Sequence, residues 1–123
     1  MAAKLDHLVI LVSSYDESLP WYGALLPLLG FEKTRDHVWV NGQGIGFDVR
    51  LAEEDARPYE RFGAGLNHIG LEVETVEALE AVRAAMAEAG FPVPEIQPFG
   101  EDRACFFKDP DGLRVEVGWT AAP

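Results

Sequence analysis

The sequence has 123 residues, of which 48% are hydrophobic and 25% are charged, a composition typical of one folded domain with a substantial core and not of a disordered chain. Asp and Glu outnumber Lys and Arg by 21 to 10, which gives a formal net charge of -11. Because an acidic protein repels phosphate groups, we expect neither nucleic acid nor an anionic membrane surface as a partner.

The first half of the chain predicts a strand, a helix and three further strands. An apolar, β-branched run at 5–12 is typical of a strand, and Ser14 followed by Glu17 indicates a capping box that begins a helix. Apolar residues then recur at helical spacing as far as Leu29, and Gly30 fits the position just beyond a helix end. The strands expected after this helix, with a glycine-containing turn between the last two, are 31–35, 37–40 and 45–51.

The second half repeats this order. A strand at 66–73 precedes a helix that Thr75 can cap and Gly90 can end. Three prolines within 91–99 favour an edge strand or an extended loop there. The last expected strands, on either side of a turn at 109–112, are 103–108 and 113–119.

This repetition predicts an α+β domain built from two tandem βαβββ modules. We expect a single domain over residues 1–123, with module one at about 4–52, a charged linker at 53–65 and module two at 66–120. One module is too small to bury its own sheet face, so the two are expected to depend on each other.

The single cysteine, Cys105, excludes an intramolecular disulfide and favours a reducing compartment. The apolar run at 8–12 is too short to cross a membrane, and no small-residue cleavage site follows it. We therefore expect a cytoplasmic protein without a targeting segment.

The two modules place the same types of side chain at matching positions. His7 and His68 each follow a polar residue in a first strand, while Asp48 and Glu116 each lie four residues after a turn glycine. Strand alternation puts both carboxylates on the face opposite their apolar neighbours. Two imidazoles and two carboxylates suit a divalent ion such as Zn, Ni, Fe, Mn or Co. The sequence predicts a metal site made of these four side chains; the alternative is a pocket that binds an organic ligand without metal.

Four motifs carry a resemblance to a known family. They are DHL at 6–8, LLGF at 28–31, LNHIGL at 66–71 and, above all, KDPDGLRVE at 108–116. With these motifs the chain resembles the vicinal oxygen chelate superfamily, which includes glyoxalase I, extradiol dioxygenases, fosfomycin and bleomycin resistance proteins, and methylmalonyl-CoA epimerase.

The resemblance implies a cupped, eight-stranded mixed sheet with the helices outside, and a homodimer. It also implies that His7, His68 and Glu116 are metal ligands and that Asp48 lies where glyoxalase I has its fourth ligand. Val9 stands where glyoxalase I tends to carry an arginine for glutathione, so the resemblance implies no glutathione-specific pocket.

The leading functional hypothesis is a metal-dependent lyase or isomerase of glyoxalase type that acts on a small oxygenated substrate. The ion would polarise a carbonyl or enediolate oxygen while Glu116 or Asp48 moves a proton. Arg50 and Arg103 are candidates to bind an anionic group of the substrate, and Trp39 is a candidate to line the cup. Surface ion pairs and core packing are the commoner roles of such residues.

Two other functions are compatible with the same residues. An Fe(II)-dependent dioxygenase could use His7, His68 and Glu116 as a facial triad for catechol ring cleavage. A non-enzymatic protein could instead hold a drug or metabolite in the cup, and the acidic surface would suit a cationic ligand.

Overall fold

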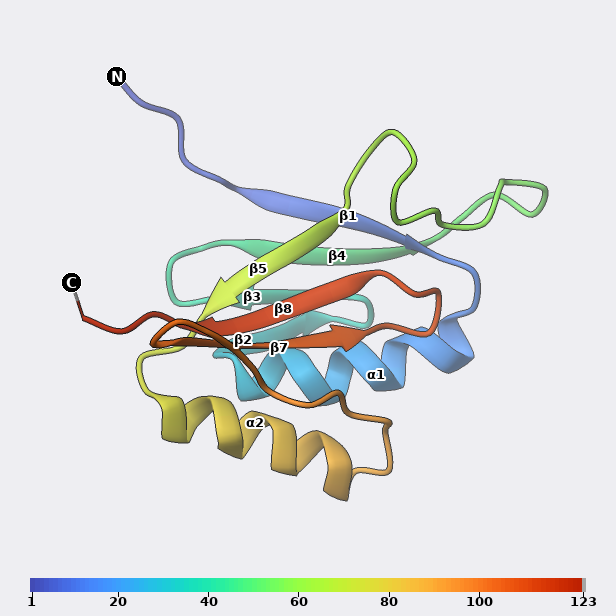
Figure 1. Cartoon of the computed structure of the whole chain (residues 1–123). Coiled ribbons are helices and arrows are strands. Elements are labelled where there is room, and N and C mark those ends of the chain that lie inside the picture. Colours follow the sequence, from blue (N-terminus) through green and yellow to red (C-terminus); the bar gives the residue numbers. More distant parts are fainter. Residues whose placement is uncertain (123) are drawn as a thin grey trace. The chain divides into compact units, whose positions relative to one another are not determined.

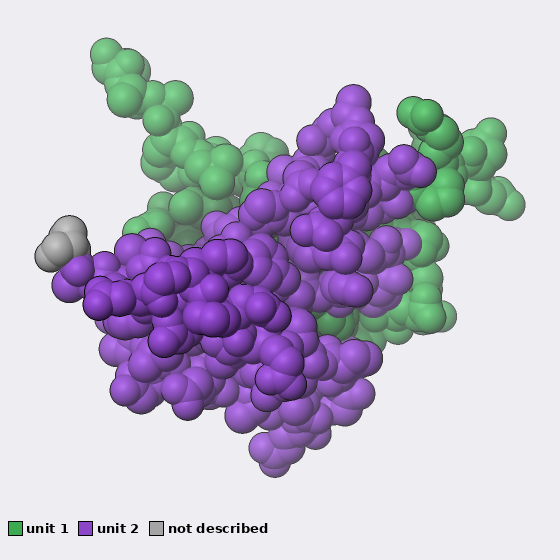
Figure 2. Space-filling model, in the orientation of Figure 1, with its two compact units in different colours: residues 1–58 green, residues 59–123 purple. Residues whose placement is uncertain are grey.

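The computed structural model describes residues 1–122 and has the expected α+β architecture, with one βαβββ module following another (Figure 1). The chain divides into two compact units, residues 1–58 and the part from Tyr59 onward, which are coloured separately in Figure 2. In the described part of the chain, no helix has the length and apolar character needed to cross a membrane.

The first unit contains one helix and a four-stranded sheet. The sheet has the strand order β1-β4-β3-β2, in which β1 runs parallel to β4 and the other neighbours are antiparallel. The elements are β1 (His7–Val12), α1 (Tyr15–Leu28), β2 (Phe31–Arg35), β3 (Val38–Asn41) and β4 (Gly46–Leu51).

The second unit repeats this topology, with the strand order β5-β8-β7-β6 and a parallel pairing of β5 with β8. Of the proline-rich segment at 91–99, only its last three residues form a strand, at the edge of the sheet. The elements are β5 (His68–Glu72), α2 (Val76–Glu88), β6 (Gln97–Phe99), β7 (Asp102–Lys108) and β8 (Arg114–Trp119).

Both helices begin and end at the residues that the sequence indicated. The Ser14 hydroxyl accepts a hydrogen bond from the Glu17 N–H, and the Thr75 hydroxyl accepts one from the Ala78 N–H. Each cap satisfies a backbone donor that the first helical turn leaves without a partner. A glycine with positive φ, Gly30 or Gly90, follows each helix end, where a side chain would be strained.

Each sheet buries one face against its own helix. In the first unit, Phe47 and Val49 of β4 are fully buried together with Leu25 and Leu26 of α1. In the second unit, Val115 and Val117 of β8 are buried in the same way, along with apolar residues of α2. Because side chains alternate along a strand, the residue between each apolar pair, Asp48 or Glu116, points to the other face of its sheet.

The turn before each last strand is the same structure in both halves. The side-chain oxygen Oδ1 of Asn41 accepts hydrogen bonds from the backbone N–H groups two and four residues further on, at 3.0 and 2.9 Å. Oδ1 of Asp109 does the same at 2.9 and 2.9 Å. Gly44 and Gly112, with φ of 79° and 93°, complete the two turns. These Asx turns fix where β4 and β8 begin, and therefore which of their residues face away from the helix.

Candidate functional site

The strand register places the predicted acids and histidines at equivalent positions in the two units. In the first unit, His7 is opposite Gly46, and Asp48 is opposite Val9. In the second unit, His68 is opposite Arg114, and Glu116 is opposite Gly70. Each acid thus lies two residues further along the neighbouring parallel strand, on the same face as the histidine.

In the second unit, His68 and Glu116 meet. The Nε2 atom of His68 lies 3.1 Å from Oε1 of Glu116, and both side chains are partly exposed. Glycines flank the carboxylate: a Cβ atom on Gly118 would lie 3.4 Å from Oε2, and one on Gly70 would lie 3.8 Å from Oε1. The absence of side chains at these two positions leaves the carboxylate oxygens accessible.

The ring orientation of His68 is fixed by the residue before it. The Nδ2 group of Asn67 donates to the carbonyl of Arg61 at 2.9 Å, which turns Oδ1 of Asn67 toward Nδ1 of His68 at 2.8 Å. Because Oδ1 only accepts, Nδ1 of His68 must carry the proton. Nε2 therefore either carries a second proton toward Glu116 or offers a lone pair, beside the carboxylate, to a cation. The second arrangement is that of a metal-ligating histidine whose other nitrogen is hydrogen-bonded to protein.

His7 has the same local arrangement in the first unit. Its Nδ1 atom lies 2.8 Å from Oδ2 of Asp6, again the residue immediately before the histidine. The hydrogen bond from His7, followed by the charge of the imidazole, lowers the pKa of Asp6, so this carboxyl stays ionised and accepts. In the neutral form of His7, with the proton on Nδ1, the lone pair of Nε2 can accept a hydrogen bond or bind a cation, as in the carboxylate–histidine pairs that support metal ligands.

Asp48 differs from Glu116 because both of its carboxylate oxygens accept hydrogen bonds from side chains of the same unit. Oδ1 receives a hydrogen bond from Nδ1 of His37 at 2.9 Å, and Oδ2 receives one from Nε of Arg50 at 2.9 Å. Burial by itself raises the pKa of this carboxyl, but the hydrogen bonds and charges of Arg50 and His37 outweigh burial, so the pKa of Asp48 lies below its usual value. His37, expected to be a strand or hairpin surface residue, lies in the turn between β2 and β3 and stacks against Tyr15.

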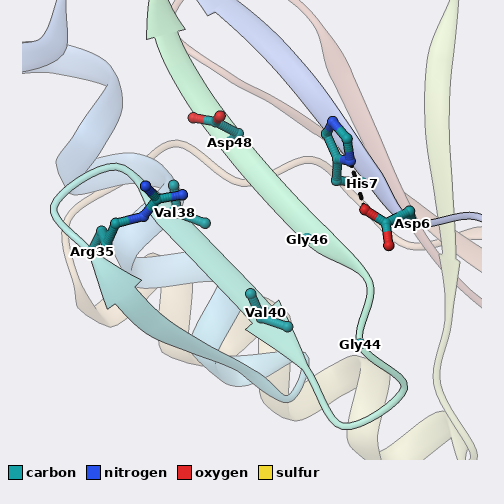
Figure 3. Close-up of a pocket in the computed structure, with 8 residues that line it drawn as sticks. All are labelled: Asp6, His7, Arg35, Val38, Val40, Gly44, Gly46 and Asp48. Atoms are coloured by element: carbon teal, nitrogen blue, oxygen red, sulfur yellow. Dashed lines mark hydrogen bonds and ion pairs between the residues drawn. The ribbon is translucent and has the colours of Figure 1, made fainter.

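A cavity of about 270 Å³ opens on this face of the first sheet (Figure 3). Its apolar part comes from Val38, Val40 and Gly46, while His7 and Arg35 lie on opposite sides of β4. The complete lining consists of Asp6, His7, Arg35, Val38, Val40, Gly44, Gly46 and Asp48. The first unit thus combines an imidazole, two acids and a guanidinium around a space of small-molecule size.

A protein-family model matches residues 4–117, most of the chain. The chain belongs to the glyoxalase/bleomycin resistance protein/dioxygenase superfamily. Members of this superfamily bind small molecules, typically use divalent metal ions and often form dimers. No protein of curated function matches the chain in sequence.

Solved structures of the superfamily show the same fold. A glyoxylase/bleomycin resistance protein/dioxygenase domain from Frankia sp. EAN1pec aligns with a TM-score of 0.79 and 19% identity, covering 98% of this chain and 94% of the other. For a glyoxalase/bleomycin resistance protein from Catenulispora acidiphila the TM-score is 0.67 and the identity 20%, with coverage of 96% and 100%. The fosfomycin resistance protein FosX from Listeria monocytogenes aligns at a TM-score of 0.73 and 13% identity, over 98% and 96% of the two chains.

Within the superfamily fold, the remaining predicted site residues have local partners. Nη1 of Arg103 donates to the carbonyls of Gly100 and Asp102, in its own hairpin. Trp39 is 2% exposed and is opposite Phe47, on the helix-facing side of the sheet, where it contacts α1 near Gly23. Trp39 therefore lies on the face opposite the cavity.

No group of three or more His, Cys, Asp or Glu side chains gathers around one point within residues 1–122. The structure brings together the pair His68 and Glu116 and, separately, places His7 and Asp48 around one cavity. Sequence reasoning missed the hydrogen-bonding roles of Asp6 and Asn67, although their shared place before a histidine was visible. It also missed Arg35, for which the sequence offered no signal.

Proposed function

We propose that this chain is a metal-dependent lyase or isomerase of glyoxalase type that acts on a small oxygenated substrate. The proposal assigns His7, His68 and Glu116 as ligands of one divalent ion, with Asp48 as the fourth acid of the site. It draws these groups from both halves of the duplicated chain, within one chain or across a homodimer. The native ion would be Zn, Ni, Fe, Mn or Co, which the imidazole and carboxylate donors suit.

The observation that carries the proposal is the orientation of the two histidines. Each has its Nδ1 bonded to the side-chain oxygen of the preceding residue, Asp6 or Asn67, so each offers Nε2 to a ligand. In one half that nitrogen already lies 3.1 Å from the carboxylate of Glu116. A core or rim histidine needs neither this support nor an acid beside its other nitrogen, whereas a metal ligand uses both.

The donor set also defines what the protein's own groups do. The ion would supply Lewis-acid polarisation of a substrate carbonyl or enediolate oxygen. Glu116, whose carboxylate lies next to two glycines and is partly exposed, is the group we assign to proton transfer at the adjacent carbon. Asp48 contributes a fixed negative charge, because Arg50 and His37 keep its carboxyl ionised.

Metal analysis of protein purified without chelator tests the proposal. We expect one equivalent of metal per site, and a higher melting temperature when Ni, Co, Zn or Mn is added to stripped protein. His68→Ala and Glu116→Gln should abolish both effects while retaining the fold. Glu80→Gln, which removes the same charge from an exposed position of α2, is the matched control and should leave both effects unchanged.

Two assays with candidate substrates distinguish the reaction classes. Exchange of deuterium from solvent into a carbon next to a substrate carbonyl would support the lyase or isomerase. Oxygen consumption with catechols would instead support the Fe(II) dioxygenase hypothesis. Absence of bound metal, together with a melting temperature that none of the four added metal ions changes, would overturn both enzyme hypotheses and favour a binding protein.

A further inference from the structure

The cavity of the first unit contains an arginine that the chain itself does not use. Among the described residues the structure gives Arg35 no hydrogen bond or ion pair, whereas Arg50 on the same sheet is paired with Asp48. Arg35 is exposed, yet it belongs to the cavity lining opposite His7 (Figure 3). An unpaired guanidinium at the wall of a cavity is available to form a bidentate pair with a carboxylate or phosphonate.

An irregularity of the sheet brings Arg35 to this face. In regular alternation from the buried Phe31, through Lys33 opposite Trp39, Arg35 would fall on the helix-facing side of β2. A register shift between Lys33 and Arg35 instead places Arg35 opposite Val38, whose other neighbour is Asp48. Such bulges redirect single side chains and are common beside functional sites.

The charges around the cavity favour an anion at the Arg35 end. The carboxylate of Asp48 is ionised, and its negative charge is balanced by the guanidinium of Arg50, to which it is bonded. Asp6 is bonded to His7 at the other end, and the Lys4 ammonium lies beside Gly44 at the cavity margin. The cavity therefore has a locally positive side in a chain whose net charge is -11. The apolar surface between the two ends comes from Val38 and Val40.

We propose that this cavity binds a small organic anion, with its carboxylate or phosphonate on Arg35 and its remaining oxygen atoms toward His7. The inference rests on the proposed function for the identity of the substrate site and adds the substrate class. Because β1 and β2 are the two outer strands of a four-stranded sheet, their axes are three interstrand spacings apart, or about 14 Å. The long side chain of Arg35 shortens that span to the length of a single-ring or short-chain acid.

Titration of the full-length protein, stripped of metal and kept in chelator, tests this assignment. The probes are 4-hydroxybenzoate, 4-hydroxyphenylphosphonate and the uncharged 4-hydroxybenzamide, followed by calorimetry and by the backbone NMR signals of Gly44 and Gly46. We expect both anions to bind at least tenfold more tightly than the amide and to shift these glycine signals. Arg35→Gln should remove the preference for anions, and Arg35→Lys should retain part of it.

Arg57→Gln is the matched control, since Arg57 is an exposed arginine of the same unit that does not line the cavity. It should bind like the wild type, and all variants should have the same melting temperature. Equal binding of anions and amide, no binding of any probe, or an unchanged preference in Arg35→Gln would each overturn the inference. Because no metal is present, these outcomes are independent of the metal analysis, which tests the proposed function separately.

Discussion

The substitution Asp48→Asn separates a structural role of this acid from a role as ligand. It keeps the size of the side chain but replaces the oxygen that faces Nε of Arg50 or Nδ1 of His37 with an amide group that only donates. A hydrogen bond to a charged group contributes about 1.5–3 kcal/mol when both partners are shielded. Here the Asp48 side chain is 12% exposed, but those of His37 and Arg50 are 32% and 56% exposed and can return to water. We therefore expect a net loss of about 2 kcal/mol in the free energy of unfolding, discounted for this solvent access.

Urea unfolding of metal-free protein at pH 7 and at pH 3 measures this difference. Since the pKa of Asp48 is lowered in the folded state, its ionised form contributes stability above the ordinary value of 3.8, and this contribution is lost as the pH falls through the lowered pKa. The gap between wild type and Asp48→Asn should therefore be full at pH 7 and smaller at pH 3. Asp55→Asn, an equal charge change at an exposed position, should show no gap at pH 7. Equal stability of wild type and Asp48→Asn at pH 7, or a gap that does not change with pH, would refute the reasoning.

Three further predictions concern other parts of the two units. Asn67→Ala should weaken metal binding about tenfold or more in a chelator competition assay, because His68 loses the acceptor of its Nδ1 proton. Asn67→Asp should restore most of the affinity. Equal affinity of Asn67→Ala and wild type would count against the role of Asn67 in supporting His68. Asp109→Ala should lower the free energy of unfolding by about 2 kcal/mol in urea, since two backbone N–H groups lose their acceptor, whereas an unchanged midpoint would contradict the turn's importance. Cys105 should react with a thiol reagent at pH 8 only after unfolding, because it is buried and burial raises its pKa to about 11, leaving roughly one thousandth as thiolate; rapid reaction of the native protein would disprove this.

The sequence was sufficient to predict the duplicated plan because its signals are local. The capping residues Ser14 and Thr75 and the glycines after each helix determine the helix ends through contacts within one turn. The first strand of each half begins two residues later than expected, at His7 and His68, which does not change which side chains share a face. The α+β class and the tandem modules are confirmed.

The partners of the site residues could not be predicted in the same way. The pairing of Asp48 with His37 depends on the geometry of the hairpin between β2 and β3, and the position of Arg35 depends on a bulge that no residue type signals. The sequence makes Trp39 a candidate to line the cup, but which face of the sheet it occupies depends on its pairing with Phe47, which puts it on the helix-facing side. The metal site formed by four side chains stays a prediction.

The interval between each turn glycine and its acid makes this protein intolerant of length changes at one point. Asp48 lies four positions after Gly44, and Glu116 lies four positions after Gly112, so three residues separate each fixed turn from the acid. One residue inserted or deleted there would reverse the inside–outside alternation downstream, directing the acid against its own helix and Val49 or Val117 toward solvent. Natural variants of this chain should therefore differ in length within the linker or the loop before β6, and retain the turn-to-acid interval.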